Sequence, residues 1–496
     1  MADHPADFKK TVKQAVEDWG NTVSPPAKLW SQMLLLRQQQ AEATVPLDHP
    51  LTPRLLLNCV LENGLQVLGQ QNKDYEAVLR TRFIDKCSIV AASEALAIAT
   101  ATVSRYQEQG LELLADIVWQ QELRLRANWQ HVIEGRLEKP TYSDNKLFGV
   151  DELAAKLKAY LTQNEAPWLI SLVGLGGIGK TSLADFMVRQ LIPTFHFYDM
   201  VWLRLAHPTI HGRSRSPQQA LQTLSLQLTE RVLPNQAAAL TQAEQAIRLR
   251  QRLKEERYLI VVDNLEEDAD LSLLLPYLHD LAQPSKFLLT TRAQPQGETA
   301  VFTQELGEIS RQAAAQLIRH HAQTIGLLPY AEIGETEINA IYERTGGNPL
   351  AIKLVVGMLK AVPPPVAIAN LQANRTHNVK KMYRRIYRQT WGYLSEPARQ
   401  VLRAMPLVGE AVAPIDYIQH LCGLDDDRFW PAIQELRQRS LIEVRGSLNE
   451  PLYGIHRLTD TFLRSDIIDG FDRFDNEPDE DENEDNDDDN VNNGSL

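Results

Sequence analysis

The chain has 496 residues, more than one hydrophobic core can organise, and its length predicts about three or four domains. With 44% hydrophobic and 23% charged residues it has the composition of a globular protein, which excludes a fibrous or largely disordered chain. The net charge of −13 is concentrated near the C-terminus, where twelve acidic residues and one arginine lie between residues 472 and 489, so the rest of the chain is nearly neutral.

The N-terminal sequence MADHPADFKK is polar and lacks the apolar core of a signal peptide. No stretch approaches the roughly 18 uninterrupted apolar residues that a membrane span needs. The three cysteines, Cys59, Cys87 and Cys422, have neither metal-ligand nor CxxC spacing, so neither a zinc site nor a disulfide framework is predicted. We therefore expect a cytoplasmic protein without a membrane partner.

Residues 1–140 are predicted to form an all-α domain, because Leu-, Ala- and Gln-rich stretches have helical spacing. Within this domain, the sequence pattern of the segment from about residue 74 to 118 predicts three helices, at 75–83, 88–96 and 100–109. Residues 89–106 resemble the helix-turn-helix of sigma-factor region four, a resemblance that implies DNA binding through residues 88–110. Nine basic and ten acidic residues between 73 and 139 provide no basic surface, so a protein contact remains the alternative.

A polar segment at 139–145 predicts a linker, after which short apolar runs alternate with amphipathic ones. This alternation predicts a parallel sheet covered by helices, and we assign it to an α/β nucleotide-binding domain at 146–298. The predicted strands are 168–173, 199–205, 258–262 and 286–290, and the intervening helices include 181–191 and 217–228.

The C-terminal part is predicted to be helical again from about residue 300. We assign 299–375 to a helical subdomain and 376–466 to a winged helix, whose strand-like runs are 441–444 and 452–455. The acidic segment 467–496 is predicted to be a disordered tail, because it cannot bury enough apolar surface to offset chain entropy.

The strongest motif is a complete GxxxxGK[ST] phosphate loop between a predicted strand and a predicted helix. Glycines permit the positive φ angles with which successive N–H groups converge on phosphate oxygens at a helix N-terminus. Lys180 would neutralise phosphate charge and the Thr181 hydroxyl would bind Mg²⁺. A glycine-rich turn that binds nothing would explain neither side chain. The predicted nucleotide contacts are Gly174, Gly176, Gly177, Ile178, Gly179, Lys180, Thr181 and Ser182.

Two further strand ends carry charges suited to nucleotide chemistry. Asp263 ends an apolar strand, as the metal-holding acid of a Walker B motif does, and with Thr181 it forms the predicted Mg²⁺ site. Because Asn264 follows it and cannot act as a base, activation of water would depend on Glu266 or Glu267, or be weak. Arg292 ends the next strand and would contact the γ-phosphate; a surface arginine is the alternative.

The order of these motifs resembles the NB-ARC branch of the STAND NTPases, a class that includes bacterial NLR-like regulators, over about residues 146–462. The resemblance implies that Asp263 and Arg292 are the Walker B acid and the sensor arginine. It implies adenine contacts from the family's entry motif, here LFGVDE at residues 147–152, and from the proline of GNPLA. It also implies a β-phosphate contact from the histidine of YGIHRL, where Arg457 replaces the usual aspartate. The residues concerned are Phe148, Gly149, Val150, Pro349 and His456.

The sequence thus predicts a multidomain α/β protein that binds ADP or ATP with Mg²⁺ and acts as a signalling switch. ADP would hold it closed, ATP would open it and favour self-association, and hydrolysis would be weak, with Asp263, Arg292 and Glu266 as catalytic residues. The alternatives are a helix-turn-helix transcription regulator with nucleotide as effector, and a conventional ATPase.

Overall fold

A computed structural model describes residues 7–463 except for 22–27, 32, 43–50, 138–145, 206–208, 211–212, 215, 235–239, 266–267, 293, 296–299, 328–333, 362–378, 409–411 and 447–449. The chain forms two compact units. The first contains residues 1–136 and 191–196, and the second contains 137–190 and the remainder. The predicted linker at 139–145, the predicted catalytic Glu266 and the predicted tail 467–496 lie outside the described residues.

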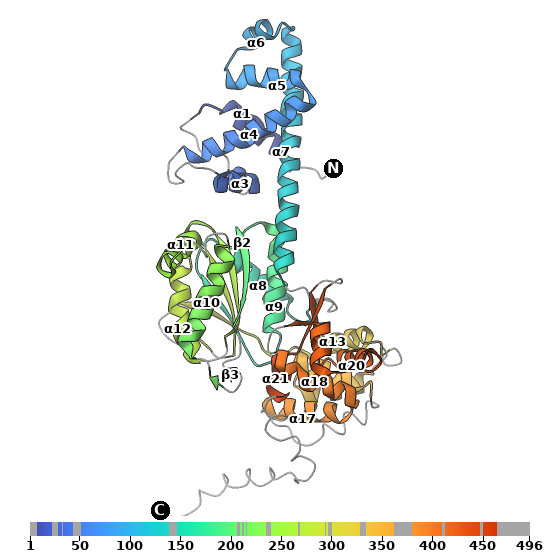
Figure 1. The fold of residues 1–496 in the computed structure, drawn as a ribbon. Coiled ribbons are helices and arrows are strands. Elements are labelled where there is room, and N and C mark those ends of the chain that lie inside the picture. The colour runs from blue at the N-terminus through green and yellow to red at the C-terminus, as the bar shows by residue number, and fades with distance from the viewer. Residues whose placement is uncertain are drawn as a thin grey trace, which may run out of the picture. The chain divides into compact units, whose positions relative to one another are not determined.

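The first unit is built from helices over its described residues (Figure 1). These are α1 (Phe8–Glu17), α2 (Lys28–Ser31), α3 (Leu34–Glu42), α4 (Thr52–Gln71), α5 (Lys73–Leu79), the π-helix η1 (Arg80–Ile84), α6 (Ile89–Leu96), α7 (Thr100–Arg136) and the short 3₁₀ helix η2 (Ile192–Thr194). Large apolar side chains such as Phe8, Trp30 and Leu61 are fully buried among them. The hydrophobic core of this unit therefore joins α1 and α4 to α7.

The helix predicted at 100–109 is only the first part of α7, which runs on to Arg136, so its predicted end is wrong. No proline interrupts this stretch, and the Leu- and Ala-rich sequence after residue 110 continues to bury a helical face. Gly64 lets α4 approach this face, because a Cβ there would lie 2.9 Å from Leu114 Cδ1. The long helix is thus held by packing along much of its length.

The buried carboxylate of Glu122 fastens α3 to α7. It accepts hydrogen bonds from the backbone N–H groups of Leu34 and Leu35 at 3.1 and 3.0 Å, and pairs with Arg126 at 2.7 Å. The first turn of α3 otherwise has no acceptor for these donors within its own helix. A fully buried charge is therefore compensated at a helix start.

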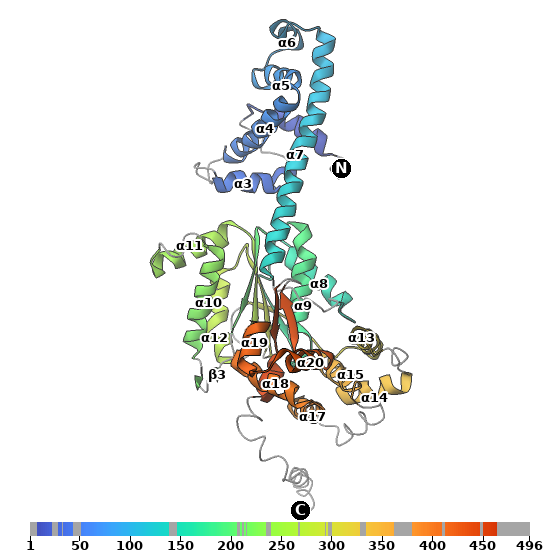
Figure 2. The same ribbon diagram turned by 45° about the vertical axis from the view of Figure 1, so that its right-hand side comes forward.

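The second unit begins with a five-stranded parallel sheet in the order β2-β5-β6-β1-β7. Its strands are β1 (Leu169–Val173), β2 (Asp199–Arg204), β5 (Tyr258–Leu265), β6 (Lys286–Thr291) and β7 (Val301–Glu305). The helices around it are α8 (Asp151–Thr162), α9 (Lys180–Leu191), α10 (Pro217–Val232), α11 (Gln242–Glu255) and α12 (Asp268–Leu281), and β3 (Thr209–Ile210) pairs with β4 (Arg213–Ser214). Helices α10 and α12 lie on one flank and α9 on the other (Figures 1 and 2).

The predicted parallel α/β architecture is confirmed, and four of the five strands lie where the sequence predicted them. The fifth, β7, was expected to be part of the helical subdomain, and that expectation is wrong for Val301–Glu305. This strand lies at the edge of the sheet beside β1 and is only partly buried. Its mixed sequence VFTQE therefore lacks the continuous apolar run that marks the central strands.

The rest of the second unit is mainly helical and shares one hydrophobic core from α13 to α21. Its elements are α13 (Arg311–Thr324), α14 (Glu335–Thr345), α15 (Pro349–Met358), α17 (Val379–Gly392), α18 (Glu396–Val408), β8 (Ala413–Pro414), α19 (Ile415–Cys422), α20 (Asp426–Gln438), β9 (Glu443–Gly446), β10 (Pro451–Gly454) and α21 (Arg457–Phe462). The two predicted strands correspond to β9 and β10, and β8 completes an antiparallel sheet in the order β8-β10-β9. Over the described residues, no helix has both the length and the apolarity that crossing a membrane requires.

Candidate functional site

The predicted phosphate loop connects β1 to α9, whose first residue is Lys180. Gly177 and Gly179 have φ angles of 73° and 105°, which side-chain-bearing residues rarely adopt. A Cβ on Gly179 would meet nothing within 4 Å, so the backbone there is accessible. The N-terminus of a 12-residue helix and an accessible glycine backbone together suit an anion.

Lys180 and its neighbours complete this loop. The Lys180 ammonium donates to the carbonyl oxygens of Gly174 and Leu175 at 2.8 and 2.9 Å, which holds the charge over the loop. Ile178 is buried and packs toward Gly174, whereas Ser182 is exposed in the first turn of α9. The cation, the helix start and the loop backbone are therefore in one place.

Asp263 lies at the C-terminal part of β5 and is 1% exposed. Its Oδ1 accepts hydrogen bonds from the hydroxyls of Thr181, at 2.8 Å, and Thr290, at 2.6 Å. Hydroxyl and carboxylate oxygens are ligands that Mg²⁺ accepts in nucleotide sites together with water and phosphate oxygens. The predicted pair, Thr181 and Asp263, is therefore close enough to share one ion.

Two residues that the sequence did not indicate complete the surroundings of Asp263. Thr290, on β6, both donates to the carboxylate and accepts from the backbone N–H of Asn264 at 3.0 Å. Arg204, at the end of β2, pairs with Asp263 Oδ2 at 3.4 Å. Their roles depend on β2 and β6 lying on either side of β5, which the strand patterns alone do not specify. The carboxylate is thus positioned from three strands and one helix.

Arg292 follows β6 and lies beside the loop. A Cβ built on Gly176 would lie 3.5 Å from Arg292 Nη2. The structure therefore places the guanidinium of this predicted sensor residue beside the phosphate loop. An arginine with no role at the loop would not need to lie there.

Asn348 and Tyr383 also contact the loop, and no pattern in the sequence indicated either of them. Asn348 Nδ2 donates to the Gly176 carbonyl at 3.1 Å, while its Oδ1 accepts from the Tyr383 hydroxyl at 2.7 Å and from the first N–H groups of α15. Burial raises the pKa of Tyr383 well above its ordinary value, so the hydroxyl stays protonated and remains a donor. Pro349 starts α15, and the next residue, Leu350, donates its N–H to the Gly177 carbonyl at 3.3 Å.

His456 precedes α21 and caps it. Its Nδ1 accepts from the backbone N–H of Leu458 at 3.1 Å, so a neutral ring carries its proton on Nε2. Leu458 itself lies against the loop, because a Cβ on Gly176 would lie 3.2 Å from both of its terminal carbons. The first turn of α21 therefore lies at the phosphate loop through Leu458, and the contact of His456 with a nucleotide stays a prediction.

The entry motif packs on α13. Phe148 is buried, with its ring 5.5 Å from that of His320, and a Cβ on Gly149 would lie 2.8 Å from Ala313 Cβ. Val150 precedes the first residue of α8. These contacts fix the motif against the helical part of the unit, and the assignment of these three residues to adenine stays a prediction.

Part of the sequence is similar to known proteins. Residues 150–305 match the family model described as the NB-ARC domain. The probable disease resistance RPP8-like protein 4 of Arabidopsis thaliana is 25% identical over an alignment of 274 residues, and the match covers 52% of this chain and 28% of that protein. The disease resistance protein RGA5 of Oryza sativa subsp. japonica is 27% identical over an alignment of 225 residues, and the match covers 44% of this chain and 19% of that protein.

Among solved structures, the STAND protein with a tetratricopeptide repeat sensor, PH0952 from Pyrococcus horikoshii, aligns with a TM-score of 0.43 and 18% identity. The alignment covers 66% of this chain and 43% of that one. For the two plant relatives, the matched part of this chain corresponds to less than a third of their own length.

Proposed function

We propose that this chain, which carries an NB-ARC domain at residues 150–305, is a switch operated by adenine nucleotide. One observation carries the proposal: side chains from three separate stretches, Arg292, Asn348 and Leu458, all meet Gly176 of the phosphate loop. Asn348 and Leu458 belong to the helical part that follows the sheet. A change in the ligand of the loop would therefore directly alter the contacts that position α15 and α21.

In the arrangement in which α21 lies on the loop, His456, whose Nδ1 accepts from Leu458, would use its Nε2–H to hold a phosphate of ADP, so ADP would favour this arrangement. ATP adds a γ-phosphate, which Arg292 and Mg²⁺ on Thr181 and Asp263 would hold. A ligand shifts such an equilibrium only by its difference in affinity for the two states. Release of α21 in the ATP state would expose surface for self-association.

Hydrolysis is proposed to be slow. Asn264, which follows Asp263, donates its backbone N–H to Thr290 and offers no carboxylate to orient or deprotonate water. Slow turnover suits a switch, because the ATP state must persist long enough to act.

The order helix, strand, two helices and two strands from Glu396 to Gly454 supports the assignment of a winged helix. In the first unit, Val78, Ala92 and Val103 form a small buried core between α5, α6 and α7 that supports the helix-turn-helix assignment. This core leaves Thr100, Ser104 and Arg105 exposed at the start of α7. DNA binding by this surface is therefore a second candidate function.

Light scattering of the full chain tests the switch. With ADP we expect a monomer, and with a non-hydrolysable ATP analogue and Mg²⁺ a larger assembly. The variant Lys180→Ala should not respond to either nucleotide, whereas Lys158→Ala, which removes an exposed lysine of α8, should respond as the parent does. The same mass with both nucleotides would contradict the proposal.

Fluorescence anisotropy with random and selected DNA duplexes tests the second candidate. Because Arg105 is the single cation among residues 100–110, we expect weak, salt-sensitive binding that appears with the ATP analogue, when several copies act together. Binding that is absent at every salt concentration would assign this surface to a protein partner.

A further inference from the structure

Helix α17 touches the phosphate loop at one end of a chain of aromatic side chains. Tyr383 is 3% exposed, and its hydroxyl would lie only 2.2 Å from a Cβ placed on Gly177. The glycine therefore leaves room for the tyrosine as well as providing a positive φ. Through Asn348 the same hydroxyl is linked to the Gly176 carbonyl.

One turn further along α17, Tyr387 makes the corresponding contact with α21. Its hydroxyl shares a 2.8 Å hydrogen bond with the buried hydroxyl of Thr459, and its ring stacks on Phe462 with centroids 5.0 Å apart. The Tyr383 and Tyr387 rings are themselves stacked, at 6.1 Å. Residues at i and i+4 face the same side of a helix, so both tyrosines move with α17 as one body.

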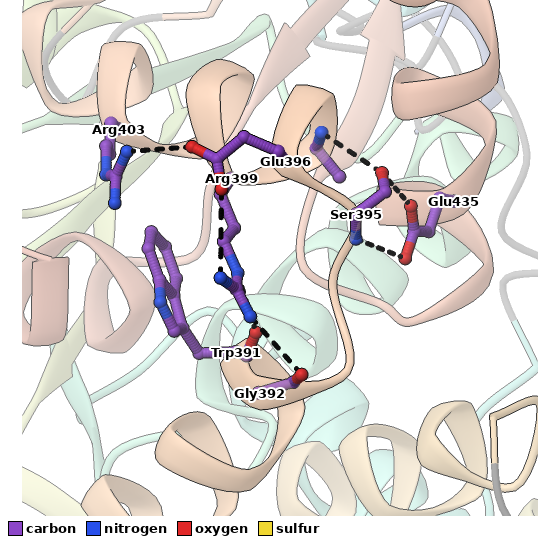
Figure 3. A network of polar contacts seen from close by, with 8 residues as sticks. Trp391, Gly392, Ser395, Glu396, Arg399, Arg403 and Glu435 are labelled. Atoms are coloured by element: carbon purple, nitrogen blue, oxygen red, sulfur yellow. Dashed lines mark hydrogen bonds and ion pairs between the residues drawn. The ribbon is translucent and has the colours of Figure 1, made fainter. Parts of the chain in front are cut away.

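The C-terminal end of α17 is fastened to the next helix. Arg399 of α18 donates to the carbonyl oxygens of Trp391 and Gly392 at 3.2 and 3.3 Å, and its guanidinium lies over the Trp391 ring (Figure 3). Ser395, at the start of α18, hydrogen-bonds Glu435 of α20 through its N–H and its hydroxyl. A displacement of α17 is therefore passed to α18 and α20 as well as to α21.

We propose that Tyr383 is a positioning residue that transmits the state of the phosphate loop to α21 through Asn348 on one side and Tyr387 on the other. The inference rests on the proposed switch and adds the route by which the loop reaches the C-terminal helices. The hydroxyl is the essential group, because Phe would keep the stacking and lose the bond to Asn348.

Hydrogen exchange of residues 451–463 in the full chain, with and without ADP, tests this route. In the parent protein ADP should slow exchange of this segment. In Tyr383→Phe the segment should exchange about fivefold faster with ADP, a typical effect of one lost hydrogen bond. The ratio of the ADP and ATP-analogue dissociation constants should change by a similar factor, because the contact belongs to the ADP arrangement.

The matched control is Tyr277→Phe, which removes a hydroxyl that donates to Ser225 at 3.1 Å between α12 and α10. It should leave both measurements at the parent values. Asn348→Asp is the second variant: it keeps an acceptor for α15 and for Tyr383 but loses the N–H that Gly176 accepts. We expect it also to speed exchange of 451–463.

If both variants behave as Tyr277→Phe does, the inference is overturned, even where the parent binds ADP normally. If the parent binds no adenine nucleotide by calorimetry, the proposed function itself fails. The two failures are therefore distinguishable in one set of proteins.

Discussion

Replacement of Thr290 by valine should weaken the attachment of β5 around Asp263. The valine fills nearly the same volume in a position that is 1% exposed, so packing changes little. Two hydrogen bonds are lost: the 2.6 Å bond to the Asp263 carboxylate and the 3.0 Å bond from the Asn264 backbone N–H.

The magnitude follows from burial. A hydrogen bond to a charged group contributes about 1.5 to 3 kcal/mol, and a buried donor left without its acceptor costs about 1 to 3 kcal/mol, which is an upper bound for the partly buried N–H of Asn264. Asp263 keeps its bond from Thr181 and its pairing with Arg204, so the two terms will not add fully. We therefore expect a loss of about 3 kcal/mol, which corresponds to roughly a hundredfold in an equilibrium constant.

Hydrogen exchange of residues 258–265 in the full chain measures this local opening. The control is Thr229→Val on α10, a 3% exposed threonine whose hydroxyl donates to a helical carbonyl at 2.7 Å, and it should speed exchange of β5 by less than about fivefold. Equal exchange of β5 in the two valine variants would refute the argument that Thr290 positions the acid.

Three further outcomes are expected. Steady-state phosphate release should stay well below the typical enzyme turnover of about 10 per second, because Asn264 supplies no base; a faster rate would indicate a conventional ATPase. His456→Ala should weaken ADP more than an ATP analogue in calorimetry, and an unchanged ratio would leave the histidine only its role as a helix cap. Burial lowers the pKa of His321 to about 3, below the roughly 6.5 of a histidine in an unfolded chain, so the folded state binds fewer protons than the unfolded state. The contribution of His321 to the free energy of unfolding should therefore be fully present above about pH 6.5. It should fall by about 1.4 kcal/mol per pH unit as the pH drops toward 3. Urea unfolding between pH 7.5 and 5 checks this, since His321→Gln should flatten the pH dependence.

Local sequence signals were sufficient for the loop and the central strands. The glycines, Lys180 and Thr181 form a contiguous motif, and buried parallel strands appear as continuous apolar runs because helices cover both faces. Asp263 and Arg292 were selected in the same way, as charges that end such runs. The side chains of Lys180, Thr181, Asp263 and Arg292 all lie around one loop in the structure, and their roles stay predictions.

Contacts between distant segments were not predictable from the same signals. Thr290 and Arg204 act on Asp263 only because their strands flank β5, and Tyr383 reaches the loop from a helix about 200 residues further along the chain. The amphipathic pattern of α17 indicates a buried face but does not say what that face covers. The edge strand β7 was missed because its sequence mixes polar and apolar residues. The predicted helix that begins α7 was ended too early, although no proline interrupts the sequence up to Arg136.

Calorimetric titration of ADP into the full chain and its Lys180→Ala variant tests the central claim most directly. The lysine holds its charge over the phosphate loop, and removing the counter-charge of a phosphate group in such a site costs about 2 to 5 kcal/mol, so affinity should fall by at least about thirtyfold. Lys158→Ala should bind as the parent does. Affinity of Lys180→Ala within about twofold of the parent would contradict the assignment of this loop as the nucleotide site.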